Sequence, residues 1–378
     1  MILPILFWGG VLLGLYPYAL YPLLAALMAR VRPHRVKSAP ICPKVSVLIC
    51  AFNEARHIEA TVRNKLGQDY QGWVDVWVAS DASTDGTDEI VARLAQDNPQ
   101  VHLYRQEPRQ GKTAALSRLV ERSSGDIIVF SDANSQYAPD TLKNLVAPFA
   151  DSDVGYVTGS MVYVNRDGSV TADGCSAYMR YENWLRRIET ELGSVVGVDG
   201  GVDAVRRELF TPMEPHQLPD FVLPLNVIEQ GYRVVYAPKA HLNEEALSTG
   251  DAEYQMRVRV ALRALWSLKE KAQLLTGSAG WLFAWQLISH KLLRYLSFIP
   301  LGIAFVAALA LAVHHPFYRV LLAFYCLALL FAWAGKHGVQ AAPARYAYYF
   351  SLLNVASAVA VWRFLKGNRQ TLWQPRVG

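Results

Sequence analysis

Hydrophobic and polar positions divide the chain into an apolar start, an alternating middle and an apolar end. The first 29 residues contain no Asp, Glu, Lys or Arg. Because about 20 helical residues cross a hydrocarbon core of ~30 Å, this run predicts an N-terminal transmembrane helix over residues 1–30. It lacks the basic start and the cleavage site of a signal peptide, so we expect the helix to be retained. The positive-inside rule places the basic linker that follows, residues 31–43, in the cytoplasm.

Uncharged stretches recur near the end of the chain and predict a C-terminal transmembrane region over residues 292–378, with a tail close to the cytoplasm. They are residues 295–318, 320–335 and 346–362. One N-terminal and three C-terminal spans would export the basic tail, against the positive-inside rule. Either residues 272–290 cross the membrane as well or residues 346–362 are re-entrant, and the sequence leaves both open. We expect amphipathic helices at the membrane interface over residues 246–291.

Residues 44–245 alternate short apolar runs with helical patterns, which predicts an α/β domain. Strands are expected at 45–51, 74–80 and 126–132, and helices at 54–66, 87–95, 113–122 and 139–149. Alternation of this kind favours right-handed crossovers and a mostly parallel, Rossmann-like sheet. Ligands of such sheets bind at the carboxyl ends of the strands, so the residues at those ends are the candidates for function.

Composition narrows the class of protein. Apolar residues make up 52% of the chain and charged residues 18%, which excludes a disordered chain and argues against an ordinary soluble enzyme. The net charge of +5 does not indicate a nucleic-acid partner, because the α/β domain has no basic face interleaved with aromatic residues. The four cysteines are far apart and form no CxxC pair, which disfavours a disulfide framework or a cysteine zinc site.

Carboxylates and an asparagine follow the predicted strands. Glu54, after the first strand, can accept hydrogen bonds from ribose hydroxyls, and Asp81, after the second, from the imide of uracil. Asp132 with Asn134, after a later strand, offers oxygen ligands to a divalent cation that bridges two phosphates. Lys112 opens a helix and can place a positive charge against a diphosphate. Each residue alone also fits a helix cap or a solvated position, whereas their order and spacing together indicate a nucleotide site.

These motifs resemble those of the membrane-bound members of glycosyltransferase family 2, the inverting group with the GT-A fold that includes cellulose, hyaluronan and chitin synthases. The segments that carry the resemblance are ICAFNEARHIEATVRN, SDASTDGT, QGKTAALS, SDAN, GVDGGVDAVRRELF, LPDFVLPLNVIEQGYRVVYAP and QMRVRVALRALWSL. Together with matches near the C-terminus, they extend over nearly the whole chain. The resemblance implies an α/β GT-A catalytic domain over residues 44–245, combined with α-helical transmembrane segments.

The resemblance also implies roles for individual residues. Asp220 would be the general base that takes the proton of the acceptor hydroxyl. Asp132 and Asn134 would hold Mg²⁺ or Mn²⁺, and Gly200 and Gly201 would let the acceptor approach the backbone. The nucleotide sugar, expected to be UDP-linked, would be bound by Ala51, Asn53, Glu54, Asp81, Lys112, Asp132 and Arg259.

The chain departs from the family pattern in the helix around Arg259. Processive synthases carry a QxxRW motif there, with a tryptophan that stacks on the growing chain, whereas this chain has Met256 and Val260 in the glutamine and tryptophan positions. Valine offers no aromatic face, so we expect transfer of one sugar to a membrane-associated acceptor, such as a lipid-linked saccharide of exopolysaccharide synthesis. A processive β-glycan synthase and a catalytically silent membrane scaffold are the alternatives. The expected location is the bacterial inner membrane, with the catalytic domain in the cytoplasm.

Overall fold

The computed structural model describes residues 2–164, 170–245 and 250–370. The chain divides into two compact units. Of the described residues, 31–164, 182–244 and 370 form the sheet unit, and 2–30, 170–181, 245 and 250–369 form the helical unit. Residues 371–378 of the predicted tail lie outside the described residues.

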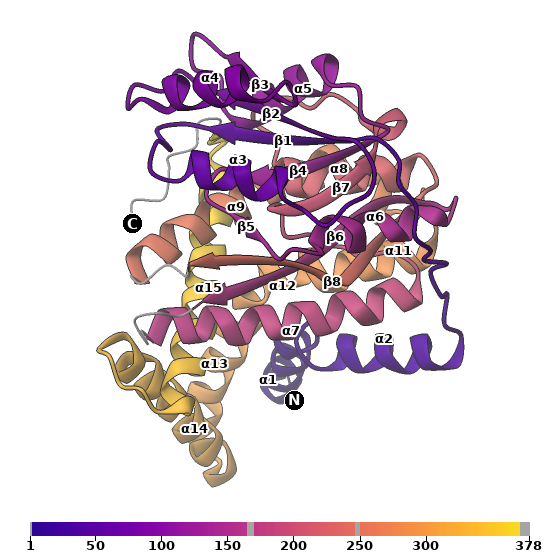
Figure 1. Cartoon of the computed structure of the whole chain (residues 1–378). Coiled ribbons are helices and arrows are strands. Elements are labelled where there is room, and N and C mark those ends of the chain that lie inside the picture. Colours follow the sequence, from indigo (N-terminus) through magenta and orange to yellow (C-terminus); the bar gives the residue numbers. More distant parts are fainter. Residues whose placement is uncertain (1, 165–169, 246–249, 371–378) are drawn as a thin grey trace. The chain divides into compact units, whose positions relative to one another are not determined.

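The sheet unit is built on an eight-stranded sheet in the order β3-β2-β1-β4-β7-β6-β8-β5 (Figure 1). The strands are β1 (Val45–Ala51), β2 (Val74–Ser80), β3 (Val101–Arg105), β4 (Ile127–Asp132), β5 (Gln136–Tyr137), β6 (Val154–Val164), β7 (Val202–Arg206) and β8 (Arg233–Glu245). The first four strands in this order are parallel, and β7 joins β4 in the antiparallel sense. The part of the sheet that carries the predicted nucleotide turns is therefore the parallel one, as the α/β prediction requires.

The three predicted strands form because their side chains are buried on both faces of the sheet. Every residue of β1 is buried, and Val47 pairs with Val76 of β2 and Val129 of β4, all at most 1% exposed. β-Branched side chains suit such positions. Strands β1, β2 and β4 end at the same edge, which places the turns after Ala51 and Asp132 next to each other.

The four predicted helices of the sheet unit are present, one of them with a later start, and two further helices lie outside the predicted set. They are α3 (Ile58–Leu66), α4 (Thr87–Asp97), α5 (Lys112–Arg122), α6 (Thr141–Val146), α8 (Pro219–Glu229) and the end of α7 (Val170–Leu192), with short 3₁₀ segments at Ala147–Ala150 and Arg207–Leu209. Helix α3 begins at Ile58 instead of the predicted Glu54, because the backbone N–H groups of Glu54 and Ala55 donate hydrogen bonds to the side chains of Thr87 and Asp85. These bonds tie the turn after β1 to the start of α4.

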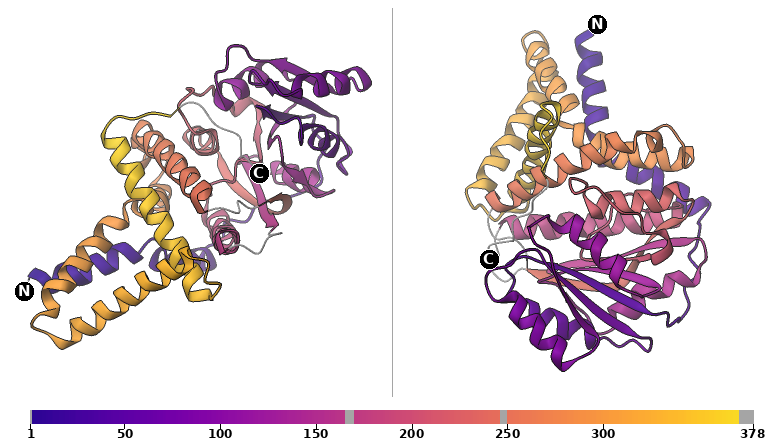
Figure 2. Two further views of the ribbon diagram at one scale, coloured as in Figure 1. Left: turned by 90° about the vertical axis from the view of Figure 1, so that its left-hand side faces the viewer. Right: turned by 90° about the horizontal axis from the view of Figure 1, so that it is seen from above.

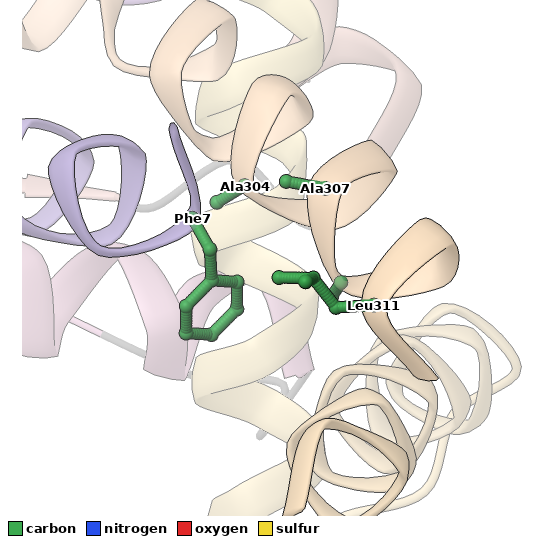
Figure 3. Packing of buried hydrophobic residues seen from close by; sticks show 5 residues of the cluster. Phe7, Ala304, Ala307 and Leu311 are labelled. Carbon is green, nitrogen blue, oxygen red and sulfur yellow. The ribbon is translucent and has the colours of Figure 1, made fainter. Parts of the chain in front are cut away.

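The helical unit combines helices from both ends of the chain. They are α1 (Ile2–Leu15), α2 (Leu20–Val31), the start of α7, α9 (Gly250–Glu270), α10 (Ala272–Leu275), α11 (Trp281–Leu287), α12 (Leu293–Leu296), α13 (Phe298–Ala312), α14 (Pro316–Lys336) and α15 (Ala342–Leu365). Helix α13 packs against both α1 and α14 (Figure 2). The core between α1 and α13 consists of Phe7, Ala304, Ala307, Ala308 and Leu311 (Figure 3). Its alanines let the helix backbones approach closely, as is common between membrane helices.

Two helices of this unit, Pro316–Lys336 and Ala342–Leu365, are long and apolar enough to cross a membrane. Two further pairs of consecutive helices are long and apolar enough only when the two helices of a pair are taken together, with a bend between them. The described residues therefore hold up to four candidate membrane spans. The pairs are Ile2–Leu15 with Leu20–Val31, bent by 54°, and Trp281–Leu296 with Phe298–Ala312, bent by 53°. The apolar run predicted as one N-terminal helix is thus two helices, and the break contains Pro17, whose ring cannot continue helical hydrogen bonding.

Candidate active site

Three charged side chains from different elements meet at the carboxyl edge of the parallel strands. Lys112 begins α5, Asp132 ends β4, and Asp220 lies in the first turn of α8. The Nζ atom of Lys112 lies 2.8 Å from Oδ1 of Asp132 and 4.0 Å from Oδ1 of Asp220. The fold therefore brings together residues predicted to act on the diphosphate, the metal and the acceptor.

The Lys112 ammonium is held in its charged form. Burial acts to lower its pKa, but the carboxylates of Asp132 and Asp220 outweigh burial and raise the pKa above its ordinary value. The side chains are not sealed off, since Lys112 is 20% exposed and the two aspartates are 32% and 30% exposed. All three can therefore reach a ligand while they hold one another in place.

A glycine turn lies against both carboxylates. Gly200 has a left-handed φ of 86°, and a β-carbon added to it would lie 2.3 Å from Cγ of Asp220. A β-carbon on Gly201 would lie 3.3 Å from Oδ2 of Asp132. Side chains are excluded from this turn, which is compatible with the predicted approach of an acceptor to Gly200 and Gly201.

Side chains of α3 fix the turn that carries Asp132 and Asn134. The Thr61 hydroxyl donates to the carbonyl of Ala133, and the Lys65 ammonium donates to a carbonyl immediately after the turn, both at 2.7 Å. Lys65 is fully buried, and burial lowers its pKa well below the usual value although Asp132 acts in the opposite sense. The turn is therefore held by buried hydrogen bonds from α3.

Two neighbouring turns, after β1 and β2, hold each other in place. Asn53 adopts a left-handed φ of 56°, donates its backbone N–H to the Ser83 hydroxyl, and accepts the backbone N–H of Thr84 on its side chain. Glu54 is tied to α4 through its backbone, and Ala51 is the buried last residue of β1. The residues predicted to bind the nucleotide from this region therefore lie together at the strand ends.

Asp81 is fully buried, and its carboxylate accepts hydrogen bonds from the segment that leads into α5. The partners are the side chain of Gln106, the backbone N–H groups of Gln110 and Gly111, and the guanidinium of Arg109. A carboxylate at a helix N-terminus is also favoured by the helix dipole. Asp81 thus fixes the start of the helix that presents Lys112, and its predicted contact with uracil stays a prediction.

Two buried aspartates beside the glycine turn are absent from the residues predicted above. Oδ2 of Asp203 accepts the backbone N–H of Gly200 at 2.7 Å, and Oδ1 of Asp199 pairs with Arg186 at 2.7 Å. Burial raises the pKa of Asp203 to about 7, and the nearby carboxylates of Asp220 and Asp199 act in the same sense. Both residues could have been found from the sequence GVDGGVDAV, because aspartates flank the two glycines that were predicted to bind the acceptor.

The residues of this site fit a hard divalent cation. Asp132 and Asn134 offer a carboxylate and an amide oxygen, and the Asp132 side chain is 32% exposed, so its carboxylate is accessible to an ion. The described residues contain no group of three or more His, Cys, Asp or Glu side chains that could hold a metal alone. A carboxylate and an amide oxygen suit Mg²⁺ or Mn²⁺, because such ions often bind through one or two protein ligands and complete their shell with water and substrate phosphates.

Arg259 lies on α9 in the helical unit, where it is partly buried. Met256 and Val260, which take the glutamine and tryptophan positions of the QxxRW motif, lie on the same helix. The predicted contact of Arg259 with a diphosphate stays a prediction.

Part of the chain matches a known protein family. Residues 46–210 match the model of the family described as Glycosyl transferase family 2. This segment is a family 2 glycosyltransferase domain. The family 2 domain includes Lys112, Asp132 and Gly200, whereas Asp220 and Arg259 lie beyond the matched residues.

Curated proteins similar to the chain carry glycosyltransferase names. The chain is 30% identical over 205 residues to the beta-monoglucosyldiacylglycerol synthase of Trichormus variabilis, a match that covers 53% of this chain and 44% of that protein. It is 27% identical over 221 residues to the N-acetylglucosaminyltransferase of Azorhizobium caulinodans, with 53% and 54% covered. The chain therefore spans about half the length of the curated relatives it matches.

A solved structure extends the likeness beyond the family 2 domain. The mannosyltransferase PcManGT of Pyrobaculum calidifontis, determined in complex with GDP-Man and Mn²⁺, matches with a TM-score of 0.74 and 26% sequence identity, covering 95% of this chain and 99% of that one. The match confirms the predicted GT-A fold with a mostly parallel sheet and a helical C-terminal region.

Proposed function

We propose that this protein is an inverting glycosyltransferase that moves a sugar from a UDP-linked donor to a membrane-associated acceptor. The observation that carries the proposal is the position of Lys112, which contacts Asp132 and lies 4.0 Å from Asp220. These three charged side chains can then act on both the departing diphosphate and the attacking hydroxyl of a displacement reaction. The names of the curated relatives support this class of reaction.

On the donor side, the turns after β1 and β2 bind the nucleotide, and Lys112 neutralises the diphosphate. The nucleotide-binding residues in this proposal are Ala51, Asn53, Glu54, Asp81 and, from α9, Arg259. Because Lys112 stays protonated, its charge opposes the negative charge that grows on the diphosphate as its bond to the sugar breaks. Mg²⁺ or Mn²⁺ held by Asp132 and Asn134 would offset the same charge, and the Mn²⁺ of the PcManGT complex supports the use of a divalent metal.

On the acceptor side, Asp220 takes the proton of the acceptor hydroxyl while the hydroxyl oxygen attacks the anomeric carbon. Attack from the face opposite the diphosphate inverts the configuration in one step, so a second carboxylate nucleophile is not needed. In this proposal the acceptor approaches the backbone of Gly200 and Gly201, which carry no side chains, beside Asp220. The Asp220 side chain is 30% exposed, which allows it to pass its proton on to water after transfer.

The proposed acceptor is membrane-bound, a lipid-linked saccharide or another lipid-associated glycan. Two candidate membrane helices in this chain and a relative named for a diacylglycerol product support that choice. The basic residues that follow the first apolar run favour the inner membrane with the sheet unit in the cytoplasm. Val260, where a stacking tryptophan would serve a processive enzyme, favours a single addition.

A nucleotide-release assay on the detergent-solubilised full chain tests the proposal. A panel of UDP-sugars and GDP-mannose is offered with Mn²⁺, Mg²⁺ or EDTA, with and without a bacterial lipid extract, and the lipid product is analysed by mass spectrometry. We expect release from a UDP-sugar that requires metal, increases with lipid, and yields a product one sugar longer. Turnover of GDP-mannose alone would contradict the UDP assignment, and a long polymer would contradict single addition. UDP binding without release from any donor would favour the silent scaffold.

A further inference from the structure

Asp203 holds the glycine turn through a buried hydrogen bond. It lies on β7 with its side chain fully buried, and its Oδ2 accepts the backbone N–H of Gly200 at 2.7 Å. Thr158 is its cross-strand neighbour on β6 and also hydrogen-bonds the carboxylate. The carboxylate of Asp203 is thus fixed to two strands of the sheet and bonds directly to the one residue of the turn that has a left-handed φ.

Gly200 links Asp203 to Asp220. Its backbone N–H is bound by Asp203, while the side where a β-carbon would project is occupied by the Asp220 carboxylate, 2.3 Å from that point. The Asp220 side chain therefore rests on a peptide segment whose position is set by Asp203. A change in the Gly200 hydrogen bond moves the surface against which Asp220 is packed.

The filling of core space does not explain a carboxylate at this position. The nearby Asp199 lies in the loop between α7 and β7. Its buried negative charge is paired with the Arg186 guanidinium at 2.7 Å. Asp203 has no ion-pair partner among the described residues, and its Oδ1 has no hydrogen-bond partner there. Burial of a carboxylate without a cation is costly, and an apolar side chain would fill the same strand position at lower cost. An apolar side chain could not accept the hydrogen bonds that Asp203 receives from Thr158 and Tyr156 on β6 and from the backbone of Gly200, and of these the bond to Gly200 is the one that reaches the turn.

We propose that Asp203 is a positioning residue for the transfer reaction, which holds the Gly200 turn so that Asp220 faces the acceptor hydroxyl. This inference rests on the proposed function, in which Asp220 is the base. Asp203 acts through the Gly200 backbone and does not touch donor or acceptor. Its loss should therefore slow turnover and leave donor binding intact.

The experiment compares Asp203→Asn with Asp203→Leu in the full chain. Asparagine keeps a side-chain oxygen that can accept the Gly200 N–H, whereas leucine has similar size and no acceptor. We expect Asp203→Leu to lower kcat by at least about 30-fold with the donor KM within about threefold of wild type, because a misplaced base affects the chemical step alone. Asp203→Asn should retain kcat within about threefold. Asp97→Leu, at an exposed aspartate at the end of α4, is the matched control and should behave as wild type.

Each result separates this inference from the proposed function. Binding of UDP, measured by calorimetry, verifies that each variant is folded, and Asp203→Ala replaces the leucine variant if that one does not bind. Full activity of Asp203→Leu, or equal loss in the asparagine and leucine variants, overturns the positioning role. Failure of both the leucine and alanine variants to fold also overturns it, since Asp203 would then be needed for folding. Asp220→Asn, run in parallel, tests the base itself: if it remains active, the proposed function fails whatever the Asp203 variants do.

Discussion

Gly200 and Asp220 are packed so closely that no side chain fits between them. A β-carbon on Gly200 would lie 2.3 Å from Cγ and 2.4 Å from Oδ2 of Asp220. The φ of Gly200, 86°, also lies in the region that disfavours residues with a side chain. The position of Asp220, the proposed base, therefore depends on residue 200 having no side chain.

Replacing Gly200 with alanine should displace Asp220 and lower kcat by at least about 100-fold, because a shift of about 1 Å in a catalytic group can cost that much. Gly231→Ala is the matched control. Gly231 has nearly the same φ, 87°, but a β-carbon on it would have no neighbour within 4 Å. The two variants are compared by nucleotide release and thermal unfolding. An equal loss of activity in both would show that backbone strain, and not displacement of Asp220, causes the effect.

Removing the charge of Lys112 should weaken catalysis strongly. In Lys112→Met the side chain stays unbranched and keeps most of its length, but it no longer neutralises the diphosphate or pairs with Asp132. We expect kcat to fall by about 100-fold, the usual effect of removing one preorganised electrostatic contact. Lys143→Met is the control, because Lys143 is about half exposed and pairs only with the exposed Asp69 in the described salt bridges. Retention of activity in Lys112→Met would contradict the proposed mechanism, in which the charge of Lys112 stabilises the departing diphosphate.

Asp203 should make stability fall as the pH rises from about 4 to 7. Its pKa in the folded protein is about 7, above the ordinary 3.8, so the folded state keeps a proton that the unfolded state has already released in this range. Above pH 7 both states are ionised and the full cost of the buried charge remains, at up to about 1.4 kcal/mol for each unit of pKa shift.

Asp203→Asn carries no such charge, so its melting temperature relative to wild type should increase between pH 5 and pH 8. Thermal unfolding at several pH values measures this difference, with Asp97→Asn as a control at an exposed position. A difference that stays constant with pH would mean that Asp203 does not hold a proton in the folded state.

The parallel part of the site could be predicted because its determinants are local. Strands β1, β2 and β4 are runs of apolar, mostly β-branched residues, and the polar residues directly after them reach the same edge of any parallel sheet. The meeting of Lys112 with Asp132 follows from that placement. The position of Asp220, on a helix far along the chain, came from the family resemblance and not from periodicity.

The antiparallel part of the sheet could not be predicted in the same way. Strand β7 has only five residues, and the polar Asp203 interrupts its apolar pattern because it pairs with Thr158 and binds Gly200. Thr158 is distant in sequence, and Gly200, although only three residues away, meets the aspartate through the shape of the turn, so the reason for the aspartate becomes visible only in the fold. The break between α1 and α2 could have been predicted from Pro17, because proline interrupts helical hydrogen bonding. A prediction based only on the length of the uncharged run does not use this residue.

The most direct test of the account is the effect of Asp220→Asn on nucleotide release from the preferred donor in the presence of metal and lipid acceptor. Asparagine keeps the size of the side chain and cannot take a proton. We expect the variant to bind UDP as wild type does and to lose turnover by at least about 1,000-fold, within the range of a general base contribution of about 10²–10⁴. Turnover within about tenfold of wild type would contradict the account, because a residue contributing so little is not the base.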